Sequence, residues 1–412
     1  MSTWVRLGGL NLQHEVVFRD EQIYASHASA CLAANGDVLV AFRQAPLEQI
    51  FAHVHPRATV GLIRSHDQAQ TWDRSTHATI FDPGEGTNLN DPSLTTLSDG
   101  TIILSVFTTP CPRQPGEWGD KALPVRGNDY YYVPSERRIL VCRSVDHGHT
   151  WEGPFEVPFK GAGVFGAVVE LEDGSILMPI TAKLEDQEAA LLIRSTDRGS
   201  SWEYYSTITK WNGGEQGALT FGLPSVIAYD DKHFLAVGWT VASSGTLITV
   251  SHDGGKTWEE VRPLHTRGSC MHLCLTSRGT TLMSYGYREK PFGIRVLPSY
   301  DQGRTWDVEQ AAALRSDGAM RDLGYPWTIE LPNGKLCCVY YFNVHETSKP
   351  YYDEKTALAL CEKWNLDPDL YTYRTAGLRF IAATIFDEEE LKSLAGTGAP
   401  REIQDVEGPT LL

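Results

Sequence analysis

The chain has 412 residues and a formal net charge of −16 at pH 7, with 42% hydrophobic and 10% aromatic residues. This acidic balance argues against nucleic acid or an anionic membrane as a partner, because both require a basic surface on the protein. No segment contains the roughly 18 continuous apolar residues of a membrane span, and residues 1–13 lack the basic and apolar regions of a secretory signal, so we expect a cytoplasmic location.

The cysteines are scattered along the chain and include no CxxC pair, which indicates neither a zinc site nor a disulfide framework. We therefore expect reduced, mostly buried thiols and no metal or other cofactor. The eight cysteines are Cys31, Cys111, Cys142, Cys270, Cys274, Cys337, Cys338 and Cys361.

Six short apolar runs along the chain each follow a turn dipeptide, as expected for the second strand of a β-hairpin. Six hairpins spread over the whole chain predict six repeated units. The turn dipeptides are Asn35-Gly36, Asp99-Gly100, Asp173-Gly174, Asp230-Asp231, Arg278-Gly279 and Asn333-Gly334.

A second repeat has the pattern Ser-x-Asp-x-Gly-x-Thr-Trp. Catalysis by every copy is implausible, and repetition at a period of about 50 residues is typical of propellers and other repeat folds. The Asp can accept backbone N–H bonds across a tight turn, Gly supplies a positive φ, and Trp fills the gap between sheets. Ala69 replaces the Gly in one copy, so that turn should be the most strained or divergent. The five copies are SHDQAQTW (Ser65–Trp72), SVDHGHTW (Ser144–Trp151), STDRGSSW (Ser195–Trp202), SHDGGKTW (Ser251–Trp258) and SYDQGRTW (Ser299–Trp306).

These motifs resemble the Asp-box of the sialidase (BNR-repeat) superfamily, whose members are six- or seven-bladed β-propellers. The resemblance covers roughly residues 20–345. Together with the six hairpins, it predicts an all-β, six-bladed β-propeller in which residues 1–412 form a single domain. The sixth unit lacks a readable Asp-box, and we expect residues 356–364 to take its place. Strands near Gln13 and Ile381 are expected to close the ring by sharing a blade.

Residues 110–138 form a long insertion between the second hairpin and its Asp-box. Loops of this length in a compact fold are usually functional or disordered. We expect the insertion to lie over the functional site, where Trp118 and residues 130–132 could stack on sugars. Packing against a neighbouring subunit in a homo-oligomer is an equally open interpretation.

The resemblance also implies that the first strand of each blade lines the central channel, and that ligands bind where these strands begin, on the face opposite the Asp-box turns. In each blade, the residues nine and seven positions before the second residue of the turn dipeptide should lie at that end of the strand. Side chains two positions apart should point the same way. The nine-residue offset selects His27, Asp91, Phe165, Gly222, Cys270 and Tyr325, and the seven-residue offset selects Ser29, Ser93, Ala167, Pro224, His272 and Trp327.

Four residues of this ring can transfer protons: His27, Asp91, His272 and Tyr325. Each one alone is more simply explained as a hydrogen-bonded polar residue in a wet channel. Their convergence from separate blades favours general acid/base catalysis instead. Trp327 of the same ring is a candidate for substrate binding.

Three arginines are candidates for an anion clamp: Arg43 and Arg288, which follow the first and fifth hairpins, and Arg295, which precedes an Asp-box. A bidentate guanidinium is suited to the carboxylate of an acidic sugar. Solvation at the surface is the usual alternative for an arginine.

Sialidases resemble one another in a triad of arginines, a Tyr nucleophile activated by Glu, and an Asp acid/base. By this resemblance Tyr325 occupies the position of the nucleophile and Arg295 that of one triad arginine. His27 replaces the first triad arginine, and the strand before the fourth Asp-box contains no arginine. The loop that usually contains the Asp acid/base has none, which argues against sialidase activity. That loop offers His53, His55 and Arg57 instead.

His, Tyr and Arg form the set that β-eliminating lyases use on uronic acids, and propeller enzymes similar in architecture include lyases and rhamnosidases that act on rhamnose–glucuronate linkages. The sequence therefore favours an enzyme that cleaves a glycosidic bond in an acidic or rhamnose-bearing glycan by β-elimination. A sialidase-like hydrolase is the first alternative, with Asp91 and Glu215 as its carboxylates and with Glu170 and Glu330 interpreted as structural. A non-catalytic glycan-binding propeller is the second.

Overall fold

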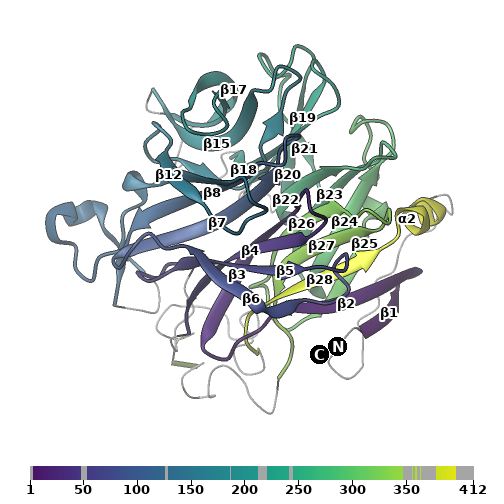
Figure 1. Cartoon of the computed structure of the whole chain (residues 1–412), viewed down its shortest axis with the longest axis horizontal. Helices are drawn as coiled ribbons and strands as arrows, with labels where there is room; N and C mark the ends of the chain where they lie inside the picture. The colour runs from purple at the N-terminus through teal and green to yellow at the C-terminus, as the bar shows by residue number, and fades with distance from the viewer. Residues whose placement is uncertain are drawn as a thin grey trace.

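The computed structural model of the chain is a ring of six antiparallel sheets, the blades of a β-propeller (Figure 1). The first strand of each blade is the innermost, and the inner strands of neighbouring blades contact one another around the axis. The predicted all-β, six-bladed architecture is confirmed. The structure describes residues 3–47, 53–125, 129–185, 187–211, 220–240, 245–346, 355, 358–359, 362 and 377–395.

Five blades each consist of one continuous part of the chain, whereas blade 6 combines both ends of it. From the axis outward, the strands are β3 (Ile23–Leu32), β4 (Val38–Pro46), β5 (Thr59–Ser65) and β6 (Asp73–Phe81) in blade 1; β7 (Thr87–Thr96), β8 (Ile102–Pro110), β11 (Arg138–Ser144) and β12 (Glu152–Glu156) in blade 2; β13 (Gly163–Val164) with β14 (Val169–Glu170), β15 (Ile176–Leu184), β16 (Gln187–Ser195) and β17 (Glu203–Trp211) in blade 3; β18 (Gly222–Ala228), β19 (Phe234–Thr240), β20 (Gly245–Ser251) and β21 (Arg262–Leu264) in blade 4; β22 (Gly268–Leu275), β23 (Thr281–Tyr287), β24 (Phe292–Ser299) and β25 (Ala312–Gly318) in blade 5; and β26 (Gly324–Glu330), β27 (Leu336–Phe342), β28 (Phe380–Phe386), β2 (Leu10–Phe18) and β1 (Thr3–Leu7) in blade 6.

The ring closes in blade 6, where β28 pairs with β27 on one side and with β2 on the other (Figure 1). Gln13 lies opposite Ile385 in this register, so the predicted sharing of a blade by the two ends of the chain is confirmed. Most of residues 356–364, expected to replace the sixth Asp-box, lie outside the described residues.

The Asp-box turns use their polar groups to hold themselves together. In the fourth copy, Asp253 accepts from the Ser251 hydroxyl and the Thr257 backbone N–H, both at 2.9 Å. The indole of Trp258 donates to the carbonyl of Gly255 at 3.1 Å. The first copy keeps the same turn with Ala69 at φ +64°, a conformation that costs a non-glycine residue energy. The strain expected of that turn is therefore present.

The antiparallel order places the hairpin and Asp-box turns on one face of the propeller and the starts of the inner strands on the other. We call this second face the mouth. The loop from residue 53 to residue 58, between β4 and β5, and the insertion of blade 2 both leave their strands on the mouth side.

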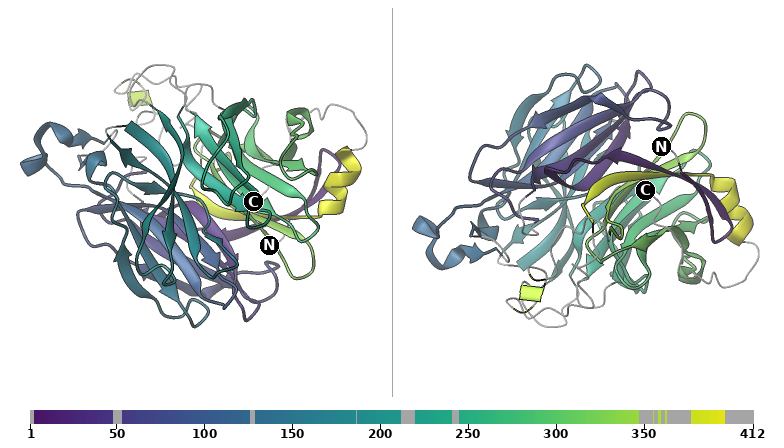
Figure 2. Two further views of the ribbon diagram at one scale, coloured as in Figure 1. Left: turned by 90° about the horizontal axis from the view of Figure 1, so that it is seen from above. Right: turned by 90° about the horizontal axis from the view of Figure 1, so that it is seen from below.

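The insertion projects from the side of the propeller, with a short helix near its tip (Figure 2). All seven cysteines of the described residues are free thiols, and six of them are buried. Within the same part of the chain, no helix is long and apolar enough to cross a membrane. The helices and strands outside the blades are η1 (Gly116–Lys121), β9 (Leu123–Pro124), β10 (Tyr131–Tyr132), η2 (Pro134–Glu136), η3 (Val308–Gln310) and α2 (Glu388–Ala395).

Candidate active site

A β-bulge interrupts the inner strand near the mouth in five of the six blades. At each bulge one non-glycine residue has a positive φ, and bulges of this kind re-aim a side chain. Such a backbone costs about 1–3 kcal/mol per residue and is often found at functional sites. The five residues are His27 (φ +51°), Asp91 (+52°), Leu223 (+51°), Cys270 (+55°) and Tyr325 (+49°).

Four of these residues are the ones that the nine-residue offset selects, while in blade 4 the bulge residue is Leu223 rather than Gly222. The bulge adds a residue to the strand, so the simple alternation expected between the two offsets does not hold. Two positions after the bulge, side chains connect neighbouring blades instead. Ser29 accepts from the Leu94 backbone N–H at 3.1 Å, and His272 accepts from the Thr328 backbone N–H at 3.3 Å.

His272 therefore lies in an inter-blade contact rather than in the polar group at the mouth. Its ring stacks on Trp327 with 4.1 Å between centroids, and burial lowers its pKa to about 3. Trp327 is 2% exposed and also contacts the ring of Phe165. Neither side chain is placed to meet a ligand from solvent.

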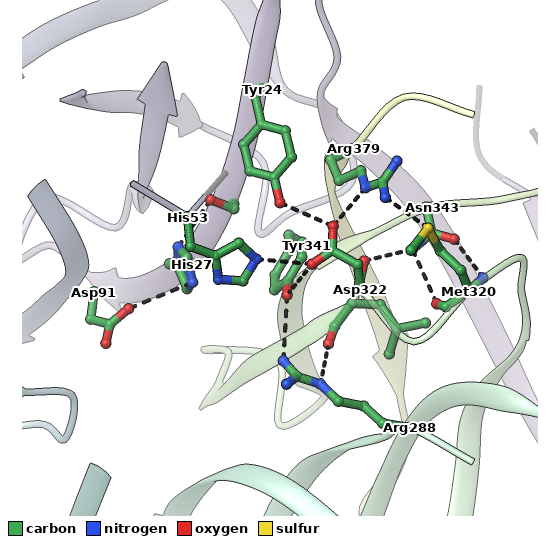
Figure 3. Close-up of polar contacts among 12 residues, drawn as sticks. Tyr24, His27, His53, Asp91, Arg288, Met320, Asp322, Tyr341, Asn343 and Arg379 are labelled. Carbon is green, nitrogen blue, oxygen red and sulfur yellow. Dashed lines mark hydrogen bonds and ion pairs between the residues drawn. The ribbon is translucent and has the colours of Figure 1, made fainter. Parts of the chain in front are cut away.

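The polar group at the mouth is centred on the carboxylate of Asp322, in the loop just before β26 (Figure 3). The Asp322 Oδ2 accepts from Tyr24 Oη at 3.0 Å and from Arg379 Nε at 2.7 Å. Its Oδ1 accepts from Tyr341 Oη at 3.0 Å. Burial alone would raise the pKa of Asp322, but the charge of Arg379 and the hydrogen bond from His53 outweigh it and hold that pKa well below its usual range.

His53 is the exposed member of this group. Its Nε2 lies 2.9 Å from Asp322 Oδ1, and its side chain is 30% exposed. A carboxylate that receives one ring nitrogen of a histidine fixes the tautomer and the orientation of the ring. His53 is therefore held in one geometry while remaining accessible from the mouth.

His27 connects His53 to the remaining ring residues. Its imidazole packs edge-on against His53, with centroids 4.7 Å apart, and against Tyr325, with centroids 4.3 Å apart. Its Nε2 lies 3.8 Å from Asp91 Oδ1. Burial, with repulsion from His53 and Arg43, lowers the pKa of His27 well below its usual value, so this ring is neutral at pH 7.

Asp91 and Tyr325 are both protonated at neutral pH. Burial raises the pKa of Asp91 to about 8, although the charges of Arg43 and Arg137 act in the opposite direction. Burial raises the pKa of Tyr325 well above 10, and the nearby Asp91 adds to this effect. Among the described residues, the Tyr325 hydroxyl contacts the thiol of Cys270, and no carboxylate hydrogen bonds to it.

Two of the predicted arginines lie beside this group. The guanidinium of Arg288 lies 5.9 Å from the ring centroid of Tyr325 and donates to Leu323 O and to Tyr341 Oη. Arg43 is fully buried, and its Nη1 has no hydrogen-bond partner among the described residues.

The other predicted residues contact different side chains. Arg295 stacks on the ring of Tyr287, 3.4 Å from its centroid. His55 is buried in the 53–58 loop, where its Nδ1 accepts from the Arg57 N–H at 3.1 Å, and Arg57 is exposed.

The carboxylates considered for a hydrolase are distributed differently. Glu170 and Glu330 accept hydrogen bonds from Ser98 and Ser277 of the preceding blades and so connect neighbouring blades. Glu215 lies outside the described residues. Within the part of the chain that the structure describes, no three His, Cys, Asp or Glu side chains converge to hold a metal ion.

Sequence reasoning missed Asp322 and three of its partners, Tyr24, Tyr341 and Arg379. Two signals could have found all of them except Arg379. Asp322 lies three positions before the bulge residue Tyr325, and Tyr24 lies three positions before the bulge residue His27. Tyr341 lies seven positions after Gly334 of its hairpin turn, just as Arg43 lies seven positions after Gly36.

The ring of six blades has the fold of the sialidase superfamily. The model of the BNR repeat-like domain family matches residues 57–338, and the chain belongs to that family.

Similarity to individual proteins is distant. A sialidase from Paraclostridium sordellii is 22% identical over 239 residues, which cover 52% of this chain and 53% of that protein. The match thus spans about half of the length of this curated relative. A solved protein of unknown function from Dyadobacter fermentans has a TM-score of 0.73 at 26% identity and covers 91% of this chain and 97% of its own. The intramolecular trans-sialidase from Ruminococcus gnavus has a TM-score of 0.61 at 14% identity, covering 90% and 95%, and this likeness concerns the fold alone.

Proposed function

We propose that this protein is a glycan-cleaving enzyme that breaks a glycosidic bond next to an acidic sugar by β-elimination. The observation that carries the proposal is the His53–Asp322 pair beside the protonated hydroxyl of Tyr325. A base and an acid held within one polar group are what elimination requires.

His53 is assigned as the base. Asp322 holds its Nε2 and so sets the tautomer and the orientation of the ring. The same carboxylate stabilises the imidazolium that forms, as in other His–Asp pairs. The exposed fraction of the ring supports direct access to a bound sugar.

Tyr325 is assigned as the acid. A nucleophilic tyrosine needs a base to remove its proton, and no described carboxylate hydrogen bonds to this hydroxyl. A tyrosine whose pKa is raised keeps its proton and is suited to donate it to a leaving oxygen.

Arg288 is assigned to the sugar carboxylate, because its guanidinium lies next to Tyr325. Neutralising that carboxylate makes the hydrogen on the adjacent ring carbon more acidic. His53 takes this proton, the electron pair forms a carbon–carbon double bond, and the bond from the next carbon to the glycosidic oxygen breaks. Tyr325 gives its proton to that oxygen, so the products are an alcohol and an unsaturated uronate.

Hydrolysis is the second candidate, favoured by the sialidase relative and by the protonated carboxyl of Asp91. In that case Asp91 would act as the general acid on the leaving oxygen. Sialic-acid and rhamnose-bearing glycans are the substrates to test beside uronic-acid oligosaccharides.

The test measures turnover on sialosides, uronic-acid oligosaccharides and rhamnose–glucuronate linkages by two readouts, new reducing ends and the ultraviolet absorbance of an unsaturated uronate. We expect absorbance and reducing ends together, and a loss of at least about 100-fold in Tyr325→Phe and His53→Ala. Arg295→Lys, away from Tyr325, is the matched control and should stay near wild type. Reducing ends without absorbance would establish hydrolysis. Glycan binding without any turnover would establish a binding propeller and overturn the proposal.

A further inference from the structure

The insertion of blade 2 is anchored on the loop that carries His53. Cys111, Val125 and Tyr130 form a small buried cluster, and Val54 packs against it from the 53–58 loop. Val54 directly follows His53 in the chain. The insertion therefore supplies the apolar support for the residue next to the assigned base.

Tyr130 is the centre of this contact. It is 4% exposed, its ring lies edge-on to that of His55 with centroids 5.9 Å apart, and the guanidinium of Arg113 lies 4.7 Å from its centroid. Rigid aromatic rings of this kind fix their neighbours through a large contact area.

Backbone hydrogen bonds tie the same loop to blade 2. The His55 N–H donates to Asn88 Oδ1 at 2.9 Å, and the Gly86 N–H donates to Pro56 O at 2.9 Å. The Cys111 N–H, at the start of the insertion, donates to Gly86 O at 2.7 Å. One continuous set of contacts thus runs from the insertion through the loop to His53.

We propose that the insertion of blade 2 is a positioning element for His53, and that Tyr130 is its main positioning residue. Asp322 holds the ring of His53 from blade 6, and the insertion of blade 2 packs against the next residue, Val54. The catalytic consequence rests on the proposed function, whereas the positioning itself does not.

The test compares Tyr130→Ala with Tyr130→Phe, which keeps the ring. The ring ¹⁵N chemical shifts of His53 report its hydrogen bond to Asp322. The His53 signals are assigned by their loss in His53→Ala, and the measurement needs no substrate. We expect Tyr130→Ala to move these shifts toward those of Asp322→Asn, and Tyr130→Phe to restore them. On a substrate that is turned over, Tyr130→Ala should lower kcat about 10- to 100-fold with little change in KM.

Tyr229→Ala controls for a general loss of stability, because Tyr229 lies on the Asp-box face, where it hydrogen bonds to Thr281. It should leave the His53 shifts unchanged. Val125→Ala, a smaller truncation in the same cluster, is the second variant if Tyr130→Ala does not fold.

The outcomes separate the two proposals. Wild-type His53 shifts in both Tyr130→Ala and Val125→Ala would overturn the positioning, whatever the activity. Altered shifts in a protein that turns over no glycan would support the positioning and overturn the proposed enzyme.

Discussion

Positive φ occurs on both faces of the propeller, at the Asp-box turns and at the bulges of the mouth. Each Asp-box turn has two successive residues at positive φ, and the second, buried one is glycine in four of the five copies, which adopts it at no steric cost. The first of the two carries a side chain in four copies, at Gln68, His147, Arg198 and Gln302, and none of these four residues is buried. At the mouth, positive φ falls on five side-chain-bearing residues. The glycines are Gly148, Gly199, Gly255 and Gly303, and the mouth residues are His27, Asp91, Leu223, Cys270 and Tyr325.

This difference separates architecture from function. The buried position of a turn repeated only to join two strands is free to evolve toward glycine, which is unstrained there. A position that must present an imidazole, a carboxyl or a phenol cannot become glycine, so the strain remains and the surrounding sheet holds it in place. Among the buried positions of the Asp-box turns, Ala69 is the one that has a positive φ without being glycine.

The largest effect is expected at the mouth, where Asp322→Ala should lower the free energy of unfolding by about 3–5 kcal/mol. The variant leaves the guanidinium of Arg379 buried without its carboxylate and removes the acceptor of Tyr24 and Tyr341. Urea unfolding measures the change. Glu156→Ala, from a pair whose side chains are 58% and 54% exposed, is the control and should change little. A loss no larger than that of the control would remove Asp322 from the centre of the group.

On the Asp-box face, Gly303→Ala should cost about 2–3 kcal/mol, because strain and crowding act together. The residue has φ +72°, and an added Cβ would lie 2.7 Å from Leu235 Cδ2 and 2.9 Å from Tyr229 Oη. Gly36→Ala isolates the strain, since φ is +90° there and nothing lies within 4 Å of the added atom. Thermal unfolding of both variants gives the two contributions, and equal losses would mean that crowding is negligible.

Asp91→Asn should change how stability depends on pH. The folded pKa of Asp91 is raised to about 8, so the folded state keeps a proton that the unfolded state has already lost. The contribution of Asp91 to the free energy of unfolding is therefore at its maximum below about pH 4. Between about pH 4 and pH 8 it falls by on the order of 1 kcal/mol per pH unit. Urea unfolding between these limits should show a smaller decline in the variant, and an unchanged decline would show that Asp91 ionises normally.

The smallest effect is expected for Ala69→Gly, which should raise the free energy of unfolding by about 0.5–1 kcal/mol. Glycine removes the strain of φ +64°, while the lost methyl contact in the core cluster offsets part of the gain. Thermal unfolding measures this change. Gly199→Ala, with φ +86° in the equivalent turn, should shift stability in the opposite direction, and a destabilised Ala69→Gly would mean that packing outweighs strain there.

Several members of the site could be predicted from the sequence because each repeats a position in the blade. His27, Asp91 and Tyr325 fall at one offset from their turns, and the structure brings them together with His53 and Arg288. His272 falls at the second offset and lies between blades instead, because the bulge changes which side chains face the channel.

The repeats, the turn glycines and the strands that close the ring follow from local rules of backbone geometry, so the sequence by itself determined the six-bladed fold. The centre of the candidate site does not follow from such rules. Asp322 receives hydrogen bonds from β3, from β27, from the loop after β4 and from the residue before β28, segments that are up to 298 positions away in the chain. Only closure of the ring brings these groups within 3.0 Å of one carboxylate. The buried charge of Arg379 and the hydrogen bond from His53 then keep that carboxylate ionised.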